Sequence, residues 1–492
     1  MGAVRRVIAA VLIASIGLFV ACSKPAPPAP SAPLPAPVAP TLRAVVAVLP
    51  LAAEDTLADG MARHFARVLG QQQALAVISP ESAFRFRDSS ELNSVIGEKL
   101  GATHLLRGTL QRSDGTLTLA VELIQTADGS TLWQQHYQRT EKEVFALQDE
   151  VLQSVAQALQ LEPLDLSAPD DRPPSKRLAA YQQVLEGEQQ LQGIDVFSIQ
   201  SAVKAFQAAL QSDPQYAYAS ARLSMARVRQ LQQFPALYSG QMERERAQAK
   251  QEAEAALQRA PNLPEAHWAM SVWLADLGSS PALGLQEMQK AVALRPSDAA
   301  LQSALAVRQI GFGKLDAALE TLRVAIKYNP LSPGPYYTLG SVYLGLANYE
   351  QAEHEFEQAL ALEPKLPLAH AFLAMAVFQQ GRSAEAIKMA QQEPEALWRH
   401  YALAMAYWVN GERAASDREL QVLIDEHASE AATQIAGVYA QRDDEESMFR
   451  WLDVARQARD PGLMEIRYMP YISRYSSDAR FTAILRELGF AP

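Results

Sequence analysis

The side chains that most often perform catalysis are spread along this 492-residue chain without a recognisable arrangement. Of the eight histidines, His354 is followed by Glu355 but lacks the second histidine that a zinc-binding helix needs four residues after the first. No Walker loop and no Gly-x-Ser-x-Gly elbow is present in the sequence. Lone histidines such as His370 and His400 are ordinarily polar helix residues, and acidic clusters such as Asp443 to Glu446 are ordinarily solvated faces. We therefore expect no enzyme, no catalytic residues, no metal site and no cofactor.

The single cysteine, Cys22, stands where covalent modification is favoured. Two arginines precede an apolar run from Val7 to Val20, which is too short and too soon followed by prolines to span a bilayer comfortably. This pattern indicates a cleaved export signal over residues 1–21. The segment Phe19-Val20-Ala21-Cys22 resembles the lipobox of bacterial lipoproteins, in which the thiol is diacylated and becomes the new amino terminus, although Phe19 departs from the usual aliphatic residue. The alternative is a signal anchor with an incidental cysteine.

The lipoprotein resemblance also implies a place in the cell. Ser23 follows the cysteine, whereas lipoproteins retained in the inner membrane carry aspartate there, so we expect an anchor in the outer membrane, facing the periplasm. Residues 22–42 alternate proline with alanine, favour the polyproline II conformation and reach on the order of 50 Å. We interpret them as a spacer, with a proline-rich ligand for a partner domain as the alternative.

The charge of the chain excludes one class of partner. The formal net charge is −11, and loss of the two arginines of the export signal makes the mature chain more acidic. No cluster of lysine or arginine backs a groove, so we expect no nucleic-acid partner and contact with the membrane only through the lipid anchor.

Residues 43–162 have the pattern of a small α/β domain. An unbroken apolar run from Ala44 to Leu49 predicts a strand covered on both faces. A helix, a second strand and a helix capped by Ser90 follow. Asp114-Gly115 and Asp128-Gly129 are hairpin turns that join three further strands before a closing helix. The order of these elements predicts a mixed sheet with helices packed on it.

Several short segments of this domain resemble the TolB amino-terminal-like domain that often precedes repeat arrays in bacterial proteins. The chain end also resembles the ending of such proteins. These segments are Val46-Ala47-Val48-Leu49-Pro50, Ala58-Asp59-Gly60, Leu100-Gly101-Ala102, the strand from Gly108 to Leu110, Gly129-x2-Leu132-Trp133, Phe145 to Glu150, Arg459 to Leu463 and Ser477 to Phe481.

Beyond a linker at residues 163–176, residues 177–459 carry a repeat with a period of 34 residues, seen in the spacing of Pro296, Pro330 and Pro364. One unit reads Tyr336-x2-Leu339-Gly340-x2-Tyr343 and then Ala352-x3-Phe356-x2-Ala359-x4-Pro364, which resembles a complete tetratricopeptide (TPR) repeat. The resemblance implies about eight stacked helical hairpins, followed by a capping segment over residues 460–492. The fold class expected is therefore α+β multidomain, with a mixed-sheet α/β domain before an all-α superhelical solenoid.

In TPR proteins the first helix of each hairpin lines the concave face, and the resemblance selects ten apolar residues there as candidate partner contacts. An exposed apolar face of this kind commonly marks an interaction site, but the same side chains could instead pack on neighbouring first helices or under the chain end. Thr338 and Ser341 stand where a carboxylate-clamp site would need asparagines, so a receptor for free carboxyl termini is not expected. The ten candidates are Trp268, Val272, Tyr337, Leu344, Phe372, Met375, Phe378, Tyr401, Met405 and Trp408.

The sequence thus predicts a lipid-anchored periplasmic adaptor that captures a segment of a partner protein by insertion of hydrophobic side chains. One alternative is an envelope sensor whose α/β domain binds a small ligand while the repeats oligomerise. A third hypothesis, a hydrolytic enzyme, would need a polar pocket with converging acid and base side chains.

Overall fold

The computed structural model describes residues 44–53, 56–72, 74–167, 171–278, 280–428, 430–458, 460, 462–463, 466 and 469–488. The predicted export signal, Cys22 and the proline-rich spacer lie outside the described residues. The chain divides into two compact units. The first unit contains the described residues up to Leu305 together with Arg323–Leu331, and the second contains Ala306–Leu322 and the residues from Ser332 onward.

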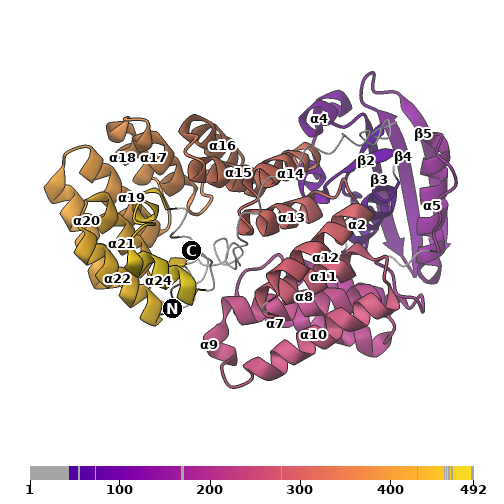
Figure 1. The fold of residues 1–492 in the computed structure, drawn as a ribbon. Coiled ribbons are helices and arrows are strands. Elements are labelled where there is room, and N and C mark those ends of the chain that lie inside the picture. Colours follow the sequence, from indigo (N-terminus) through magenta and orange to yellow (C-terminus); the bar gives the residue numbers. More distant parts are fainter. Residues whose placement is uncertain are drawn as a thin grey trace, which may run out of the picture. The chain divides into compact units, whose positions relative to one another are not determined.

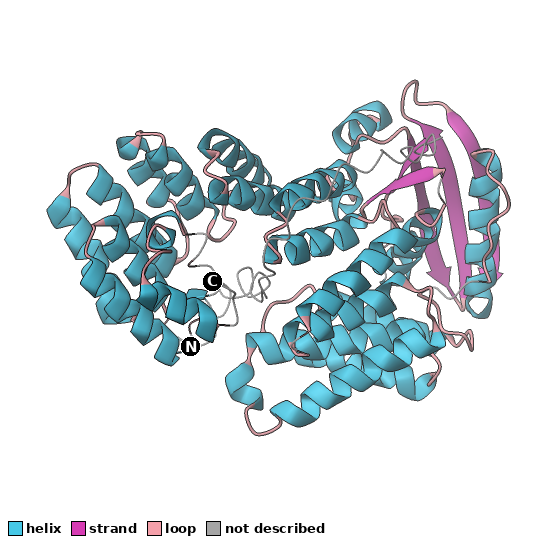
Figure 2. Ribbon diagram, in the orientation of Figure 1, coloured by secondary structure: helices cyan, strands magenta, loops and turns pink. Residues whose placement is uncertain are grey.

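The strands of the first unit form one mixed sheet, drawn in magenta in Figure 2. Their order in the sheet is β2-β1-β3-β4-β5. β1 pairs in parallel with β2 and β3, whereas β3, β4 and β5 are antiparallel. This is the mixed sheet that the sequence predicts. The strands are β1 (Ala44–Val48), β2 (Leu75–Ile78), β3 (His104–Ser113), β4 (Thr116–Gln125) and β5 (Thr131–Thr140).

Two helices, α2 (Thr56–Leu69) and α5 (Val144–Ala158), pack their apolar sides on one face of this sheet (Figure 1). Alternate residues of β4 point into that core, from Leu117 to Leu123, as the period of two in the sequence predicts. The hairpin turns need left-handed backbone at Gly115 and Gly129, where φ is +73° in both cases. One local prediction was wrong: helix α4 (Asn93–Leu100) begins after an exposed Leu92, so Ser90 does not cap it.

The hydrophobic core of the sheet continues into the helical part of the chain. Tyr181 on helix α6 (Leu178–Gln190) is fully buried in the same core cluster as α2 and α5, and Leu178 and Leu185 pack against it. Within the predicted linker, Asp171 is buried and accepts a hydrogen bond from His64 on α2. The α/β domain therefore does not have a core of its own that ends near residue 162.

Helices follow one another in pairs through the rest of the chain. Among the described residues a short helix, α9 (Pro235–Tyr238), stands between the members of the second pair, where the sequence exceeds the repeat period. The pairs are α6 (Leu178–Gln190) and α7 (Val196–Ser212); α8 (Ala217–Gln233) and α10 (Met242–Arg259); α11 (Pro264–Asp276) and α12 (Pro281–Leu294); α13 (Ala299–Gly311) and α14 (Leu315–Tyr328); α15 (Pro333–Gly345) and α16 (Tyr349–Leu362); α17 (Ala369–Gln379) and α18 (Ser383–Ala390); α19 (Ala396–Val409) and α20 (Arg413–His427); α21 (Ala432–Gln441) and α22 (Glu445–Ala458). Two short helices follow within the described residues, α23 (Pro470–Ser473) and α24 (Ala479–Glu487).

The recurring prolines end the second helices, because proline lacks the backbone donor that a continuing helix would use. α16 ends at Leu362, two residues before Pro364, and α12 ends at Leu294, two residues before Pro296. Within the pair α15 and α16, a Cβ atom placed on Gly340 would lie 2.9 Å from the ring of Phe356, which is fully buried. The absence of a side chain at Gly340 therefore permits this helix crossing.

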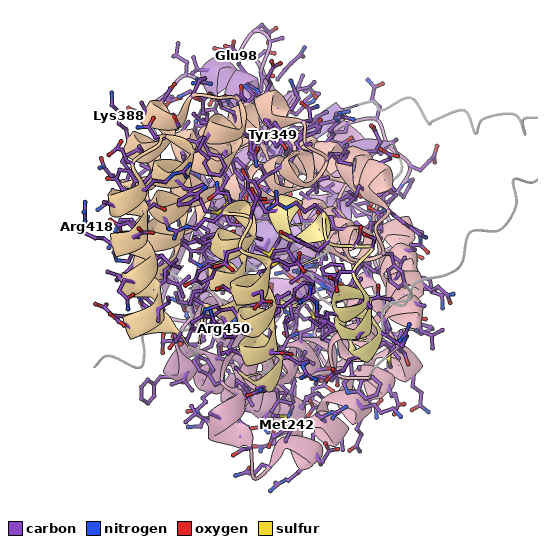
Figure 3. The ribbon with its side chains drawn as sticks, turned by 60° about the vertical axis from the view of Figure 1, so that its left-hand side comes forward. Glu98, Met242, Tyr349, Lys388, Arg418 and Arg450 are labelled. Carbon is purple, nitrogen blue, oxygen red and sulfur yellow. The ribbon has the colours of Figure 1, made fainter. Side chains whose placement is uncertain are left out.

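The second helices turn charged residues to solvent. Lys388 on α18, Arg418 on α20 and Arg450 on α22 are all exposed, and Figure 3 shows their side chains on the outside of the second unit. These helices bury alanine and leucine at helical spacing on the opposite side, as in Leu420 and Leu423. No helix within the described ranges is both long enough and apolar enough to traverse a bilayer.

Candidate functional site

The ten predicted contact residues all lie on first helices. Trp268 and Val272 are on α11 in the first unit, and the other eight are on α15, α17 and α19 in the second unit. The two groups therefore belong to different units.

Six of the ten are buried, so the expectation of an exposed apolar wall is wrong for them. Their rings and side chains pack on neighbouring helices instead of facing solvent. The exposed fractions are 7% for Tyr337, 9% for Leu344, 9% for Met375, 3% for Phe378, 4% for Tyr401 and 2% for Met405. Trp268, Val272, Phe372 and Trp408 are partly exposed. Whether any of the ten contacts a partner protein stays a prediction.

Two of the buried candidates, Tyr337 and Tyr401, belong to a continuous run of aromatic rings. The ring of Tyr337 lies 5.7 Å from that of Phe356 and 5.9 Å from that of Phe372, measured between centroids. Phe372 continues to Trp398 at 5.5 Å, and Trp398 reaches Tyr401 at 5.9 Å. Rings at these separations attract one another beyond the area they bury, so this run joins α15, α16, α17 and α19. Trp398, which the repeat offset does not select, is central to it.

Trp408 is the partly exposed candidate with the most defined surroundings. The guanidinium carbons of Arg413 and Arg442 lie 3.4 Å and 4.6 Å from the centroids of its rings. Arg413 also donates a hydrogen bond to the carbonyl oxygen of Trp408, at 2.9 Å. Cation–π contacts of this kind hold the indole in place while part of it remains accessible.

The first helices of the second unit also hold part of the chain's own end. We call residues 469–475 the C-terminal segment; it includes α23. The amide nitrogen of Gln379 on α17 donates to the hydroxyl of Tyr471 at 3.1 Å, and the amide nitrogen of Gln441 on α21 lies 3.5 Å from the same oxygen. Burial raises the pKa of this tyrosine, against the effect of the two amides.

Further contacts fix the same segment on α21. A Cβ atom on Gly437 would lie 3.1 Å from the terminal methyl of Met469 and 3.1 Å from the hydroxyl oxygen of Tyr401. Arg474 donates a hydrogen bond to the carbonyl oxygen of Ala440 and forms an ion pair with Asp443 at 2.6 Å. The C-terminal segment thus packs on α21 and reaches Gln379 at the end of α17.

The first unit contains a buried ion network that the sequence did not reveal. Arg67 on α2 pairs with Asp171 and lies 3.3 Å from Glu265 on α11. Glu265 also pairs with Arg295 at 3.0 Å, and Arg295 pairs with Asp298 at 2.8 Å. These residues are as much as 231 positions apart in the chain, from Arg67 to Asp298, so no local motif signals the network.

Burial and pairing act in opposite directions on the carboxylates of this network. Burial by itself raises the pKa of Asp171, but Arg67 and His64 outweigh it and hold that pKa well below its usual range. Burial likewise raises the pKa of Glu265, and Arg295 and Arg67 bring it below the ordinary value. Both carboxylates therefore stay ionised, and each already has its counter-charge. Their arrangement joins α2 to α11 and leaves neither group available as an acid or a base.

The histidines are not gathered into a site. His400 lies 2.6 Å from Glu419, and His370 lies 3.1 Å from the carbonyl oxygen of Pro364. Nowhere in the part of the chain that the structure describes do three or more histidine, cysteine or acidic side chains meet where they could hold a metal ion.

Residues 333–366 match the family model for the tetratricopeptide repeat. The paired helices form a TPR array. Two curated proteins of Rhizobium meliloti strain 1021 are similar to parts of this chain. One, named "Putative adenylate cyclase 3", is 24% identical over 221 residues, which is 44% of this chain and 37% of that protein. The other, the cytochrome c-type biogenesis protein CycH, is 28% identical over 171 residues, 33% of this chain and 39% of that protein. The chain thus spans less than two-fifths of the length of either relative.

Solved structures with related helical arrays include pilF of Pseudomonas aeruginosa, with a TM-score of 0.34 and 20% identity over 43% of this chain and 93% of that one. PilW, a type IV pilus biogenesis factor, has a TM-score of 0.36 and 16% identity over 44% of this chain and 92% of that one. Human IFIT1 has a TM-score of 0.39 and 16% identity over 64% of this chain and 79% of that one.

Proposed function

We propose that this protein is a lipid-anchored adaptor of the bacterial cell envelope, held in the outer membrane and facing the periplasm, whose TPR array captures a segment of a partner protein. The observation that carries the proposal is that the first helices of the second unit already hold a polypeptide, the C-terminal segment at residues 469–475. This segment is held through a tyrosine and a methionine and through Ile472, which is fully buried among residues of α21, α22 and α24. A surface of this kind is suited to another segment of similar chemistry.

The chemistry of this surface defines the partner. Gln379 and Gln441 offer amide donors to a hydroxyl, and Tyr401 and Gly437 accept an unbranched apolar side chain. Phe372 and Trp408 leave part of their rings accessible on α17 and α19. The partner segment therefore carries tyrosine and methionine or similar residues, and it replaces residues 469–475 when it binds.

We further propose that the adaptor is not an enzyme and needs no cofactor. The adenylate cyclase name of one relative is not transferred, because the match covers 37% of that protein at 24% identity. The name of the second relative, a cytochrome c-type biogenesis protein, supports a role in assembly. Nucleic acid is not a proposed partner, since the net charge is −11.

Partner capture should increase when the C-terminal segment is weakened. In Tyr471→Ala the two amide contacts to the tyrosine hydroxyl are lost. Their loss should destabilise the bound C-terminal segment by up to roughly 1.4 kcal/mol, so the state in which this segment has left the surface should be populated up to about tenfold more than in the parent. The full mature chain, immobilised and exposed to detergent-solubilised envelopes, should retain correspondingly more of the same partner. A synthetic peptide of residues 466–478 should compete with that partner, whereas a scrambled peptide should not.

The matched control is Tyr238→Ala, because Tyr238 also receives a hydrogen bond from a glutamine amide, Gln200 at 2.7 Å, but belongs to the first unit. Capture by this variant should equal that of the parent. Equal recovery by the parent and by Tyr471→Ala, or no competition by the peptide, would show that the partner does not use this surface.

Lipid anchoring is tested separately. Growth with radiolabelled palmitate should label the parent protein and leave Cys22→Ser unlabelled, because the chain has no other cysteine. The labelled parent should sediment with outer membranes, and the variant should lose that association, since multiple acyl chains provide the stable attachment. An unlabelled parent, or a variant that sediments in the same way, would refute the anchor without bearing on the partner surface.

The alternative function, an envelope sensor with a ligand-binding α/β domain and oligomerising repeats, must be tested on the whole chain. A fragment of residues 43–165 lacks Tyr181 and Leu185, which complete its core. Ligand-induced stabilisation of the full protein, together with self-association and no partner capture, would favour this alternative.

A further inference from the structure

A cleft in the first unit lies where α2 meets α6 and α8. Two cavities of about 330 and 380 Å³ open there, and they share Gly60, Arg63, Leu185, Glu188 and Gln192 on their walls. Gly60 and Leu185 form the contact between the helices, since a Cβ atom on Gly60 would lie 2.5 Å from Leu185. Cavities of this volume are in the range of small-molecule sites.

Arg63 is the charged group on these walls whose pairing is incomplete. Its guanidinium lies 4.7 Å from the ring centroid of Phe84, and it makes no ion pair or hydrogen bond with any carboxylate among the described residues. The neighbouring Arg87, 5.6 Å from the same ring, pairs with Asp59 at 2.6 Å. Burial lowers the pKa of Arg63, and the negative charges of Glu188 and Asp59 only partly oppose this effect.

Glu188, a second carboxylate near Arg63, is likewise paired with other residues. Glu188 accepts hydrogen bonds from Arg222 at 2.8 Å and from the hydroxyl of Tyr218 at 3.0 Å. Because Asp59 pairs with Arg87 and Glu188 pairs with Arg222, neither of these carboxylates forms a salt bridge with Arg63, although the walls of the two cavities together hold five arginines and six carboxylates. A half-buried guanidinium whose N–H donors are free can bind a planar anion such as a carboxylate through two parallel charge-assisted hydrogen bonds.

We propose that this cleft binds a small molecule that carries a single carboxylate, which pairs with Arg63 while its apolar body lies against Leu185. A monoanion is favoured over a phosphate, because Asp59 and Glu188 flank the guanidinium and would repel a second negative charge. This site is independent of partner capture by the second unit.

The test is a titration of the full mature protein with benzoate, followed by calorimetry or ligand-observed NMR. Benzoate should bind the parent, and the neutral analogue benzyl alcohol should not. Arg63→Gln should weaken benzoate binding by about tenfold or more, because a hydrogen-bonded charged pair is lost. Arg63→Lys retains the charge without the planar fork and should show an intermediate loss.

Arg85→Gln is the matched control, because Arg85 follows Phe84 directly and its side chain is exposed. It should bind benzoate as the parent does. Circular dichroism melting of each variant separates lost binding from lost folding. If Arg63→Gln unfolds, the test of benzoate binding rests on Arg63→Lys instead. Absence of benzoate binding to the parent, equal binding by both Arg63 variants and the parent, or tighter binding of inorganic phosphate than of benzoate would each overturn the proposal. None of these results would affect capture of a partner by the Tyr471→Ala variant.

Discussion

Glu265→Gln should lower the free energy of unfolding of the first unit by about 3–5 kcal/mol, the usual cost of removing one partner from a buried ion pair. Glu265 is the carboxylate that Arg67 and Arg295 share, at 3.3 Å and 3.0 Å. A neutral amide would leave two buried guanidinium groups with less counter-charge and facing one another. Urea unfolding followed by circular dichroism should show the loss as an early transition.

The control for this change is Glu254→Gln on α10. Glu254 forms an ion pair with Lys250 at 3.5 Å, but both side chains are about half exposed, so little stability depends on them. The same chemical substitution in a neighbouring helix should therefore leave the unfolding curve almost unchanged. If both variants unfold like the parent, the network does not stabilise the first unit as its burial implies.

The contrast between these two glutamates shows what sequence could and could not predict. Helices, strands and hairpin turns follow local periods, so the mixed sheet and the repeat were predictable from the spacing of residues such as Leu117, Gly129 and Pro364. Glu265 and Glu254 look alike in sequence, and only the fold places one beside Arg67 and Arg295. Burial of charge depends on contacts between distant residues, which no local period records.

The candidate partner surface also depends on contacts between distant residues, which the sequence could not predict. The 34-residue repeat placed Tyr337, Phe372 and Tyr401 on first helices, which the structure confirms. It could not say that Trp398 would stack between Phe372 and Tyr401, or that Tyr471 would reach Gln379. The chain end has no repeat pattern of its own, so its place on the first helices was not predictable.

A core role and a partner-binding role for Tyr337 make opposite predictions. Tyr337 is 7% exposed and its ring contacts those of Phe356 and Phe372. We expect Tyr337→Ala to cost about 3–5 kcal/mol of stability in the second unit, as large-to-small changes of buried aromatic residues do. Trp408→Ala removes a ring that is already partly in water, so it should cost much less stability while weakening capture of the partner.

These two variants must be measured singly, because a combined variant that unfolds would lose capture for either reason. Urea unfolding gives the stability of each, and capture is then compared under conditions where both remain folded. If Tyr337→Ala unfolds like the parent and yet loses the partner, its ring is a contact residue and its burial in the free protein is transient. If Trp408→Ala captures as well as the parent, the partner surface does not extend to α19. The expected pattern, stability lost at Tyr337 and capture lost at Trp408, would separate the aromatic core of the TPR array from the surface it presents.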